Sequence, residues 1–151
     1  LKALVARVAA RDLFDLSRVA ARSPSLLDDP LARALMVRAI SMSDPFPLRV
    51  DPTAALARFD AMAGDTVDPL RAMLAAGDDP DFAEMQASVE KLLLPLKRLT
   101  PDETEYLRLM GEEATYRPEL LFEQWPEVLR RARLDPAMEW KVLNLRKRPR
   151  D

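Results

Sequence analysis

Six Asp-Pro dipeptides are distributed along this chain, and they limit its possible folds more than any other feature of the sequence. Asp is a favoured N-cap and Pro is favoured at the first position of a helix, so most of these dipeptides indicate helix starts. Thr100 and Pro101 with Glu103 predict one more start, a capping box in which Thr100 caps and Glu103 reaches back. The dipeptides are Asp29-Pro30, Asp44-Pro45, Asp51-Pro52, Asp68-Pro69, Asp79-Pro80 and Asp135-Pro136.

Strand signals are nearly missing, because no segment alternates β-branched or aromatic residues with polar ones. Good helix formers dominate instead. We therefore predict an all-α fold, a compact bundle of about seven to nine short helices joined by short linkers. It forms a single helical domain over 1–151, with one helix interrupted at Trp125-Pro126. The predicted helices cover about 1–22, 30–42, 52–63, 67–76, 80–95, 101–113, 118–133 and 136–147.

The composition excludes several kinds of chemistry. The chain has no cysteine and no histidine, so disulfides, Ser-His and Cys-His catalysis and imidazole-bound metals are ruled out. A net charge of −2 rules out a globally basic nucleic-acid binder but leaves room for a local basic patch. No run approaches the ~20 apolar residues of a membrane span, and no signal peptide is recognisable. We expect a cytoplasmic protein without a membrane partner.

The first predicted helix has an apolar face and an arc of arginines, with one aspartate at each. On a helical wheel, Asp15 borders an arc of arginines, whereas Asp12 points into the middle of the apolar face. Leu13 and Phe14 lie off that face, so we expect the helix to be covered on more than one side. The apolar face consists of Leu1, Val5, Val8, Ala9, Leu16 and Val19. The arginine arc consists of Arg7, Arg11, Arg18 and Arg22.

The two carboxylates of this helix therefore predict different roles. Asp12 needs a buried partner, because an unpaired buried charge is very costly, and we interpret it as a structural carboxylate. Asp15 borders a cationic surface on which a phosphate-bearing substrate or a metal could sit. The alternative is a solvated salt bridge, since Arg11 and Asp15 are four residues apart.

Basic and aromatic residues near the end of the chain allow two interpretations each. The tail of Arg146, Lys147, Arg148 and Arg150 either binds RNA phosphates or serves solubility. Arg130, Arg131 and Arg133 lie in the last turn of a predicted helix, where positive charges are expected to interact favourably with the helix dipole. Trp125 and Trp140 are expected to pack between helices rather than to stack on bases.

The opening segment resembles a motif of the AbiEii/AbiGii nucleotidyltransferase toxin family, K-x-x-A-L-x-x-R-x-x-x-R-D-x-x-D-L. The matching residues run from Ala3 to Leu16, and the lysine of the motif falls just before Leu1. Two later segments are also similar to the family. Tyr116–Phe122 resembles its P-x-L-L-F segment, and Asp135-Pro136 with Trp140-Lys141 and Asn144 resembles H-P-x-x-x-W-K-x-x-N, with Asp135 in place of His.

The resemblance implies a metal-dependent nucleotidyltransferase of a toxin–antitoxin, abortive-infection system. An upstream α/β lobe would carry a Gly-Ser or Gly-Gly turn and a metal-binding Asp pair, and Asp15 would complete the active site as catalytic and metal-binding residue. Arg7, Arg11, Arg18 and Arg22 would contact substrate phosphates. The implied partners are NTP, tRNA whose 3′ end accepts nucleotides, and a cognate antitoxin, with Mg²⁺ as cofactor.

Several features of the family are not found in this sequence. Leu1 already lies inside an amphipathic pattern without a cap, so we expect an absent upstream lobe. Gly64, Gly77 and Gly111 each stand alone, and no Gly-rich phosphate loop is present. The intact protein is thus expected to be an enzyme and this stretch alone inactive. The alternatives are a catalytically inactive helical module that docks an antitoxin or RNA, and a helical domain of unrelated function.

Overall fold

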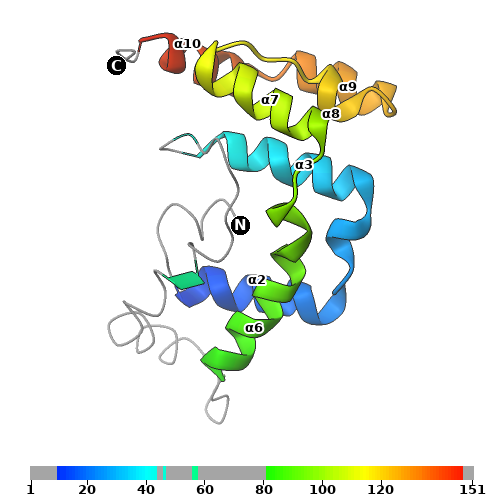
Figure 1. Ribbon diagram of the computed structural model, residues 1–151, viewed down its shortest axis with the longest axis vertical. Helices are drawn as coiled ribbons and strands as arrows, with labels where there is room; N and C mark the ends of the chain where they lie inside the picture. The colour runs from blue at the N-terminus through cyan, green and yellow to red at the C-terminus, as the bar shows by residue number, and fades with distance from the viewer. Residues whose placement is uncertain (1–9, 44–45, 47–55, 58–80, 148–151) are drawn as a thin grey trace. The chain divides into compact units, whose positions relative to one another are not determined.

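The computed structural model describes residues 10–43, 46, 56–57 and 81–147. This part of the chain contains seven α-helices, two short 3-10 helices and no strand (Figure 1). The all-α prediction is therefore confirmed. None of these helices is long and apolar enough to cross a membrane.

The chain divides into two units, each assembled from two separate stretches. The first unit comprises Leu1–Asp29 and Asp51–Lys97, and the second comprises Pro30–Val50 and Arg98–Asp151. The expectation of a single domain over 1–151 stays a prediction, and we describe each unit by itself.

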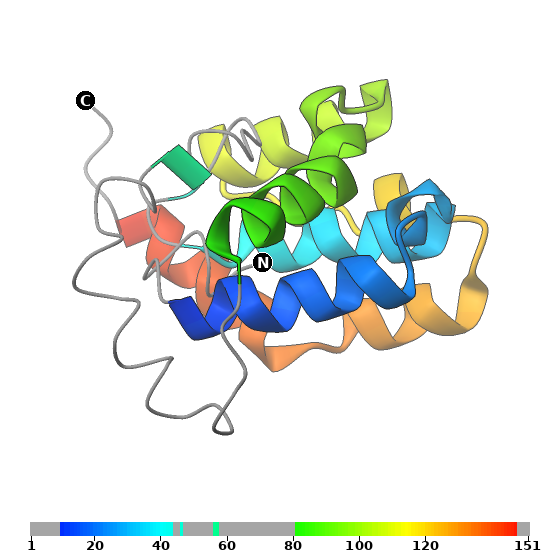
Figure 2. The same cartoon turned by 90° about the horizontal axis from the view of Figure 1, so that it is seen from below.

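The first unit is built around two helices that pack on each other, α2 (Ala10–Arg22) and α6 (Phe82–Leu93) (Figure 2). The short helix η1 (Leu26–Asp28) packs against α6 and against η2 (Leu94–Lys97), which continues α6. Apolar side chains of all four elements are buried and form the core of this unit. They include Leu13, Leu16, Leu27, Val89, Leu92, Leu93 and Leu96.

The second unit contains five helices. They are α3 (Pro30–Ser41), α7 (Pro101–Glu112), α8 (Glu119–Phe122), α9 (Pro126–Arg133) and α10 (Pro136–Lys147). α3 packs against α7 and α8, and α8 packs against both α7 and α9. The short α8 thus connects the longer helices of this unit.

Tyr106 lies fully buried in the core of the second unit. Its ring meets that of Tyr116 edge to face, with centroids 6.2 Å apart and planes inclined by 69°. Its hydroxyl lies 2.9 Å from that of Ser41, which itself donates to the carbonyl of Arg38 at 2.7 Å. A buried phenol without a partner would be costly, so this chain of hydrogen bonds explains how the core accepts it.

The helix starts follow the proline signals closely. Pro30, Pro101, Pro126 and Pro136 are each the first residue of a helix, and the predicted interruption at Trp125-Pro126 separates α8 from α9. The capping box of α7 is present. The Glu103 amide donates to Thr100 Oγ1 at 3.2 Å, and the Thr100 amide donates to Glu103 Oε2 at 2.8 Å.

One start is displaced from its prediction. α6 begins at Phe82 and is capped by Asp81, whose Oδ1 accepts from the Glu84 amide at 3.0 Å, rather than by Asp79. The predicted helices 52–63 and 67–76 lie outside the described residues, apart from Leu56 and Ala57, which are helical. The dipeptides at 44–45, 51–52, 68–69 and 79–80 also lie outside them.

The expected apolar face of the first helix is only partly confirmed within α2, where Leu16 is buried as expected but Val19 is not. Val19 is 39 % exposed, whereas Leu13, which was placed off that face, is fully buried. The reason is that α2 packs on α6 and its buried side is the arc of Leu13, Leu16 and Ala20, which fall within about 60° of one another on the wheel. Asp12 lies at the edge of this arc and not at its middle.

Candidate functional site

The arginines of α2 lie together on its exposed side. Arg11, Arg18, Arg22 and Asp15 fall within about 60° of the wheel, with Asp15 at one edge, and all four side chains are exposed. We call these four residues the α2 stripe. Arg7, which was predicted to extend the stripe, lies outside the described residues.

The α2 stripe carries more positive than negative charge. Arg11 Nε lies 3.9 Å from Asp15 Oδ2, and the two side chains are 70 % and 64 % exposed. An exposed pair at this distance is weak, so it does not hold either side chain firmly. The guanidinium carbon of Arg18 lies 6.0 Å from the centre of the Phe14 ring. In the part of the chain that is described, Arg18 and Arg22 have no carboxylate partner.

Asp12 has different surroundings from Asp15, although it lies less than one turn away. It is buried, at 8 % exposure, and it has an interaction partner. These surroundings suit a carboxylate that stabilises the fold, while Asp15 is open to a ligand. The assignment of the two roles stays a prediction.

The magnesium implied by the family resemblance is not matched by these residues alone. Among the described residues, no three carboxylates gather where they could hold a metal. Asp15 is a single carboxylate flanked by arginines, whereas Mg²⁺ requires several oxygen ligands in an octahedral arrangement. The described side chains therefore support no chemical step through this ion.

The basic tail begins at the end of α10, where Arg146 and Lys147 are exposed. Arg148 and Arg150 lie outside the described residues. The expectation that Trp140 packs between helices is wrong, because it is 65 % exposed, and Leu143 one turn later is exposed as well. The side of α10 that carries Met138 and Lys141 is buried instead, and Trp140 points away from it. Trp125 is half-buried.

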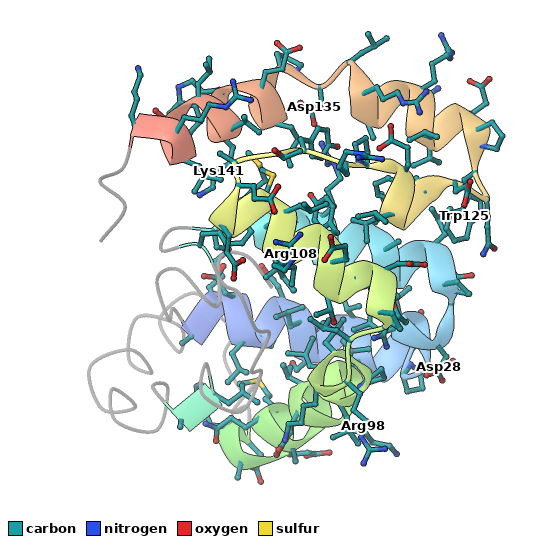
Figure 3. The ribbon with its side chains drawn as sticks, turned by 45° about the horizontal axis from the view of Figure 1, so that its top comes forward. Asp28, Arg98, Arg108, Trp125, Asp135 and Lys141 are labelled. Carbon is teal, nitrogen blue, oxygen red and sulfur yellow. The ribbon has the colours of Figure 1, made fainter. Side chains whose placement is uncertain are left out.

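Asp135 and Lys141, which are labelled in Figure 3, each make a contact that holds α10 in place. Asp135 forms an ion pair with Arg38 of α3, and its Oδ1 accepts from the Ala137 amide at 2.9 Å. Lys141 is buried at 4 % exposure and donates to the carbonyl of Ser43 at 2.6 Å. Both residues therefore join α10 to the region of α3.

Arg38 is a centre of interactions that no sequence pattern indicated. Its Nε donates to Tyr116 Oη at 3.3 Å, and Tyr116 donates to the carbonyl of Ala132 at 3.2 Å. Burial acts to lower the pKa of Arg38, but its contacts with Tyr116 and Asp135 outweigh this and raise the pKa. The sequence offered one signal for this role, because Arg38 lies between the apolar residues Val37 and Ile40, which are both buried.

A second ion pair was also missed. Arg33 binds Glu103 with two hydrogen bonds, Nε to Oε1 at 2.7 Å and Nη2 to Oε2 at 2.8 Å. Both side chains are largely buried, and the hydrogen bonds that Arg33 donates to Glu103 raise the pKa of Arg33. Glu103 was expected only as part of a capping box, so one carboxylate both caps α7 and binds α3.

Comparisons of this chain with protein-family models, with curated proteins and with solved structures find no match. Its function must therefore be inferred from the residues and their geometry.

Proposed function

We propose that this chain is the helical lobe of a metal-dependent nucleotidyltransferase toxin, in which the α2 stripe binds the phosphates of the nucleotide. The observation that carries the proposal is the uncompensated charge of the stripe. Arg18 and Arg22 are exposed and lack carboxylate partners among the described residues, although acidic residues outnumber basic ones in the chain as a whole, 25 to 23.

Arginines in this arrangement suit a phosphate ligand. A guanidinium presents N–H donors in a planar fork that matches two phosphate oxygens, and hydrogen bonds between ions are stronger than neutral ones. Arg11, Arg18 and Arg22, at i, i+7 and i+11, share one face of α2, so the helix can present three such forks to one polyphosphate. A solvated lattice of salt bridges would require more carboxylates than the single Asp15.

The proposed reaction joins a nucleotide to an acceptor, with the 3′ end of tRNA as the proposed acceptor. The acceptor hydroxyl forms a bond to the α-phosphorus, and pyrophosphate leaves as the phosphoanhydride bond breaks. Arginines that neutralise the developing charge stabilise this transition state. In this proposal Asp15 accepts a hydrogen bond from the attacking hydroxyl and takes its proton as the bond to phosphorus forms. The metal carboxylates and the antitoxin partner enter the proposal through the family resemblance alone.

The experiment compares Asp15→Ala, Asp12→Ala and Asp28→Ala in the natural full-length protein. Asp28 is an exposed carboxylate of the same unit and serves as the matched control. We expect Asp15→Ala to abolish incorporation of labelled nucleotide into total RNA without lowering the melting temperature. Asp12→Ala is expected to lower stability, by about 3–5 kcal/mol if it breaks a buried charge pair.

Two outcomes contradict this proposal. If Asp15→Ala keeps the transfer activity of the Asp28→Ala control, Asp15 is not a catalytic residue. If Asp15→Ala lowers the melting temperature as much as Asp12→Ala, the pair of Arg11 and Asp15 serves the fold.

A second candidate function is a catalytically inactive module that docks an antitoxin protein or RNA. The exposure of Trp140 and Leu143 on α10, which also carries Arg146, favours it, because aromatic residues and arginine are enriched at binding surfaces. The same experiment separates the two candidates. A full-length protein that lacks transfer activity before any substitution supports the module.

A further inference from the structure

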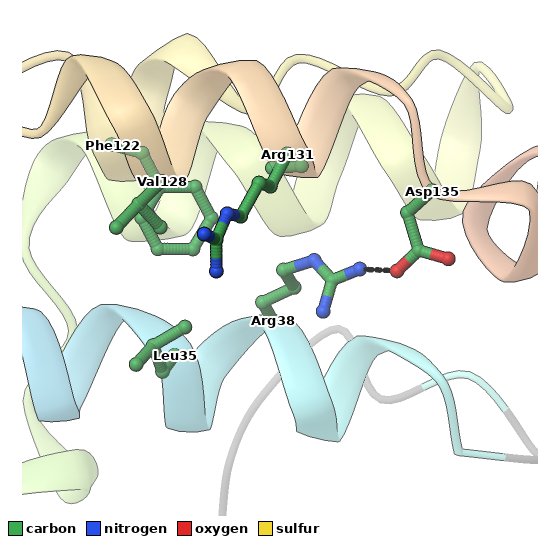
Figure 4. A pocket seen from close by; sticks show the side chains of 7 residues that line it. Leu35, Arg38, Phe122, Val128, Arg131 and Asp135 are labelled. Atoms are coloured by element: carbon green, nitrogen blue, oxygen red, sulfur yellow. Dashed lines mark hydrogen bonds and ion pairs between the residues drawn. The ribbon is translucent and has the colours of Figure 1, made fainter.

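A groove between α3 and α9 is lined by none of the residues assigned above to nucleotide binding. It has a volume of about 290 Å³, just below the roughly 300–1,000 Å³ range of ligand pockets, which suits a small ligand. Arg131 of α9 reaches over the groove on the side of Val128, and Arg38 of α3 extends toward Asp135 (Figure 4). All of these residues belong to the second unit.

The charges in this groove do not balance. Asp135 is the one carboxylate in its lining, and both of its oxygens are engaged, Oδ2 by Arg38 and Oδ1 by the Ala137 amide. Arg131 has no carboxylate partner among the described residues. The groove therefore has one uncompensated positive charge.

Arg131 differs in this respect from its neighbours at the end of α9. Arg130 forms an ion pair with Glu127 at 3.0 Å, and Arg133 forms one with Glu119 at 2.9 Å. The helix dipole, which was expected to account for all three arginines, does not explain why one of them lies over a groove without a partner.

Arg38 also retains free donors. Its Nε donates to Tyr116 and its Nη2 to Asp135, while its Nη1 donates to no group in the described part of the chain. A guanidinium has five N–H donors, so Arg38 can share an anion with Arg131 without releasing either existing partner.

The remaining lining of the groove is largely apolar. Phe122 and Val128 lie on one side, and Leu35 of α3 lies across from them with 43 % of its surface exposed (Figure 4). A fully hydrated anion such as phosphate would gain nothing from these side chains. A ligand with an apolar end would remove apolar surface from water, which contributes roughly 25 cal/mol per Å².

We propose that this groove binds a small organic carboxylate with an alkyl or aryl end. The carboxylate accepts hydrogen bonds from Arg131 and from Nη1 of Arg38, and the apolar end packs against Leu35 and Val128. The proposal is independent of nucleotidyl transfer, because none of these residues belongs to the α2 stripe.

The test is a nuclear magnetic resonance titration of the isotope-labelled chain with benzoate as the probe. Benzyl alcohol has the same ring without the charge, and inorganic phosphate has charge without the ring. We expect saturable shifts of the amides of Val128–Ala132 and Leu35–Arg38 with benzoate, and much weaker responses to the two controls.

Arg131→Gln is the informative variant and Arg130→Gln its matched control, because Arg130 is adjacent, exposed and already paired. We expect Arg131→Gln to weaken benzoate binding by about tenfold or more, the loss of an ionic hydrogen bond, and Arg130→Gln to leave it unchanged. Arg38 is not substituted in this test, because it also binds Asp135 and Tyr116 and its loss would disturb the fold. The proposal is overturned if benzoate gives no saturable shifts, if phosphate binds as tightly as benzoate, or if both variants weaken binding equally.

Discussion

Glu103 and Glu105 lie two positions apart on α7 and each binds an arginine, but in different surroundings. The pair of Glu103 with Arg33 is largely buried and joins α7 to α3. The pair of Glu105 with Arg108 is exposed on one helix surface, at 2.8 Å, and Arg108 is also paired with Glu113. Burial decides the value of each pair, because exposed pairs are screened by water and breaking a buried one leaves an uncompensated charge.

We therefore expect substitution of the two glutamates to change stability by very different amounts. Glu103→Ala is expected to lower the free energy of unfolding by about 3–5 kcal/mol, because Arg33 keeps its charge in a buried position and the capping box is lost. Glu105→Ala is expected to leave the denaturation midpoint nearly unchanged. Urea unfolding of both variants measures the difference, and equal midpoints would show that the Arg33 pair contributes no more than a surface pair.

The two tyrosines predict a stability change at high pH. Burial raises the pKa of Tyr106, partly offset by the hydrogen bond with Ser41. Burial also raises the pKa of Tyr116, partly offset by Arg38. In the unfolded chain both phenols titrate near the ordinary value of about 10. Below that pH the folded and unfolded states both keep the phenolic protons, so the two tyrosines contribute fully to the free energy of unfolding. Above it the unfolded chain loses these protons first, and stability falls as pH rises toward the folded pKa values.

Ultraviolet absorbance of tyrosinate tests this directly, since the chain contains only these two tyrosines. The folded protein should develop the absorbance at higher pH than the same protein in denaturant. Tyr106→Phe should reduce the loss of stability above pH ~10. Superimposable titrations of the folded and denatured protein would contradict the buried environment of both rings.

At the scale of single elements, the sequence was informative where the controlling interactions are local. The starts of α3, α7, α9 and α10 follow from proline at the first helical position, and that of α7 also from its capping box. The α2 stripe follows from the spacing of its members by three and four residues. The buried side of α2 did not follow, because it depends on α6, about 70 residues later along the chain.

The interactions that join elements of the second unit were equally inaccessible. Arg38 and Asp135 are 97 residues apart, and Arg33 and Glu103 are 70 apart, so no local pattern links them. The exposure of Trp140 was missed for the same reason. It depends on which side of α10 carries Met138 and Lys141 into contact with the rest of the unit.

The buried side of α2 can be tested by truncating one residue on each side of the helix. Leu13→Ala is expected to lower the free energy of unfolding by about 2–5 kcal/mol, the usual cost of a cavity in a packed core. Val19→Ala is expected to have a much smaller effect, because Val19 is partly exposed and its replacement opens no cavity. A larger loss for Val19→Ala in thermal or urea unfolding would restore the apolar face first assigned from the sequence.

At the scale of the whole molecule, the two units are formed by stretches that alternate along the chain, and this arrangement affects how cooperatively the chain unfolds. Pro30–Val50 belongs to the second unit, but the stretches before and after it belong to the first. If the first unit unfolded alone, Asp51–Lys97 would become a long loop between two ordered parts of the second unit. Closing such a loop costs entropy, so unfolding of the first unit should weaken the second even without considering contacts between them.

We therefore expect the chain to unfold in a single transition, and the aromatic residues allow a sharp test. Both tryptophans, Trp125 and Trp140, lie in the second unit, so tryptophan fluorescence reports on that unit, whereas far-ultraviolet circular dichroism reports on helices of both. Leu13→Ala alters only the first unit. It should nevertheless lower the midpoint measured by fluorescence as much as the midpoint measured by circular dichroism, since coincident transitions are the mark of one cooperative domain. An earlier phase in circular dichroism with an unchanged fluorescence midpoint would instead establish two independent domains.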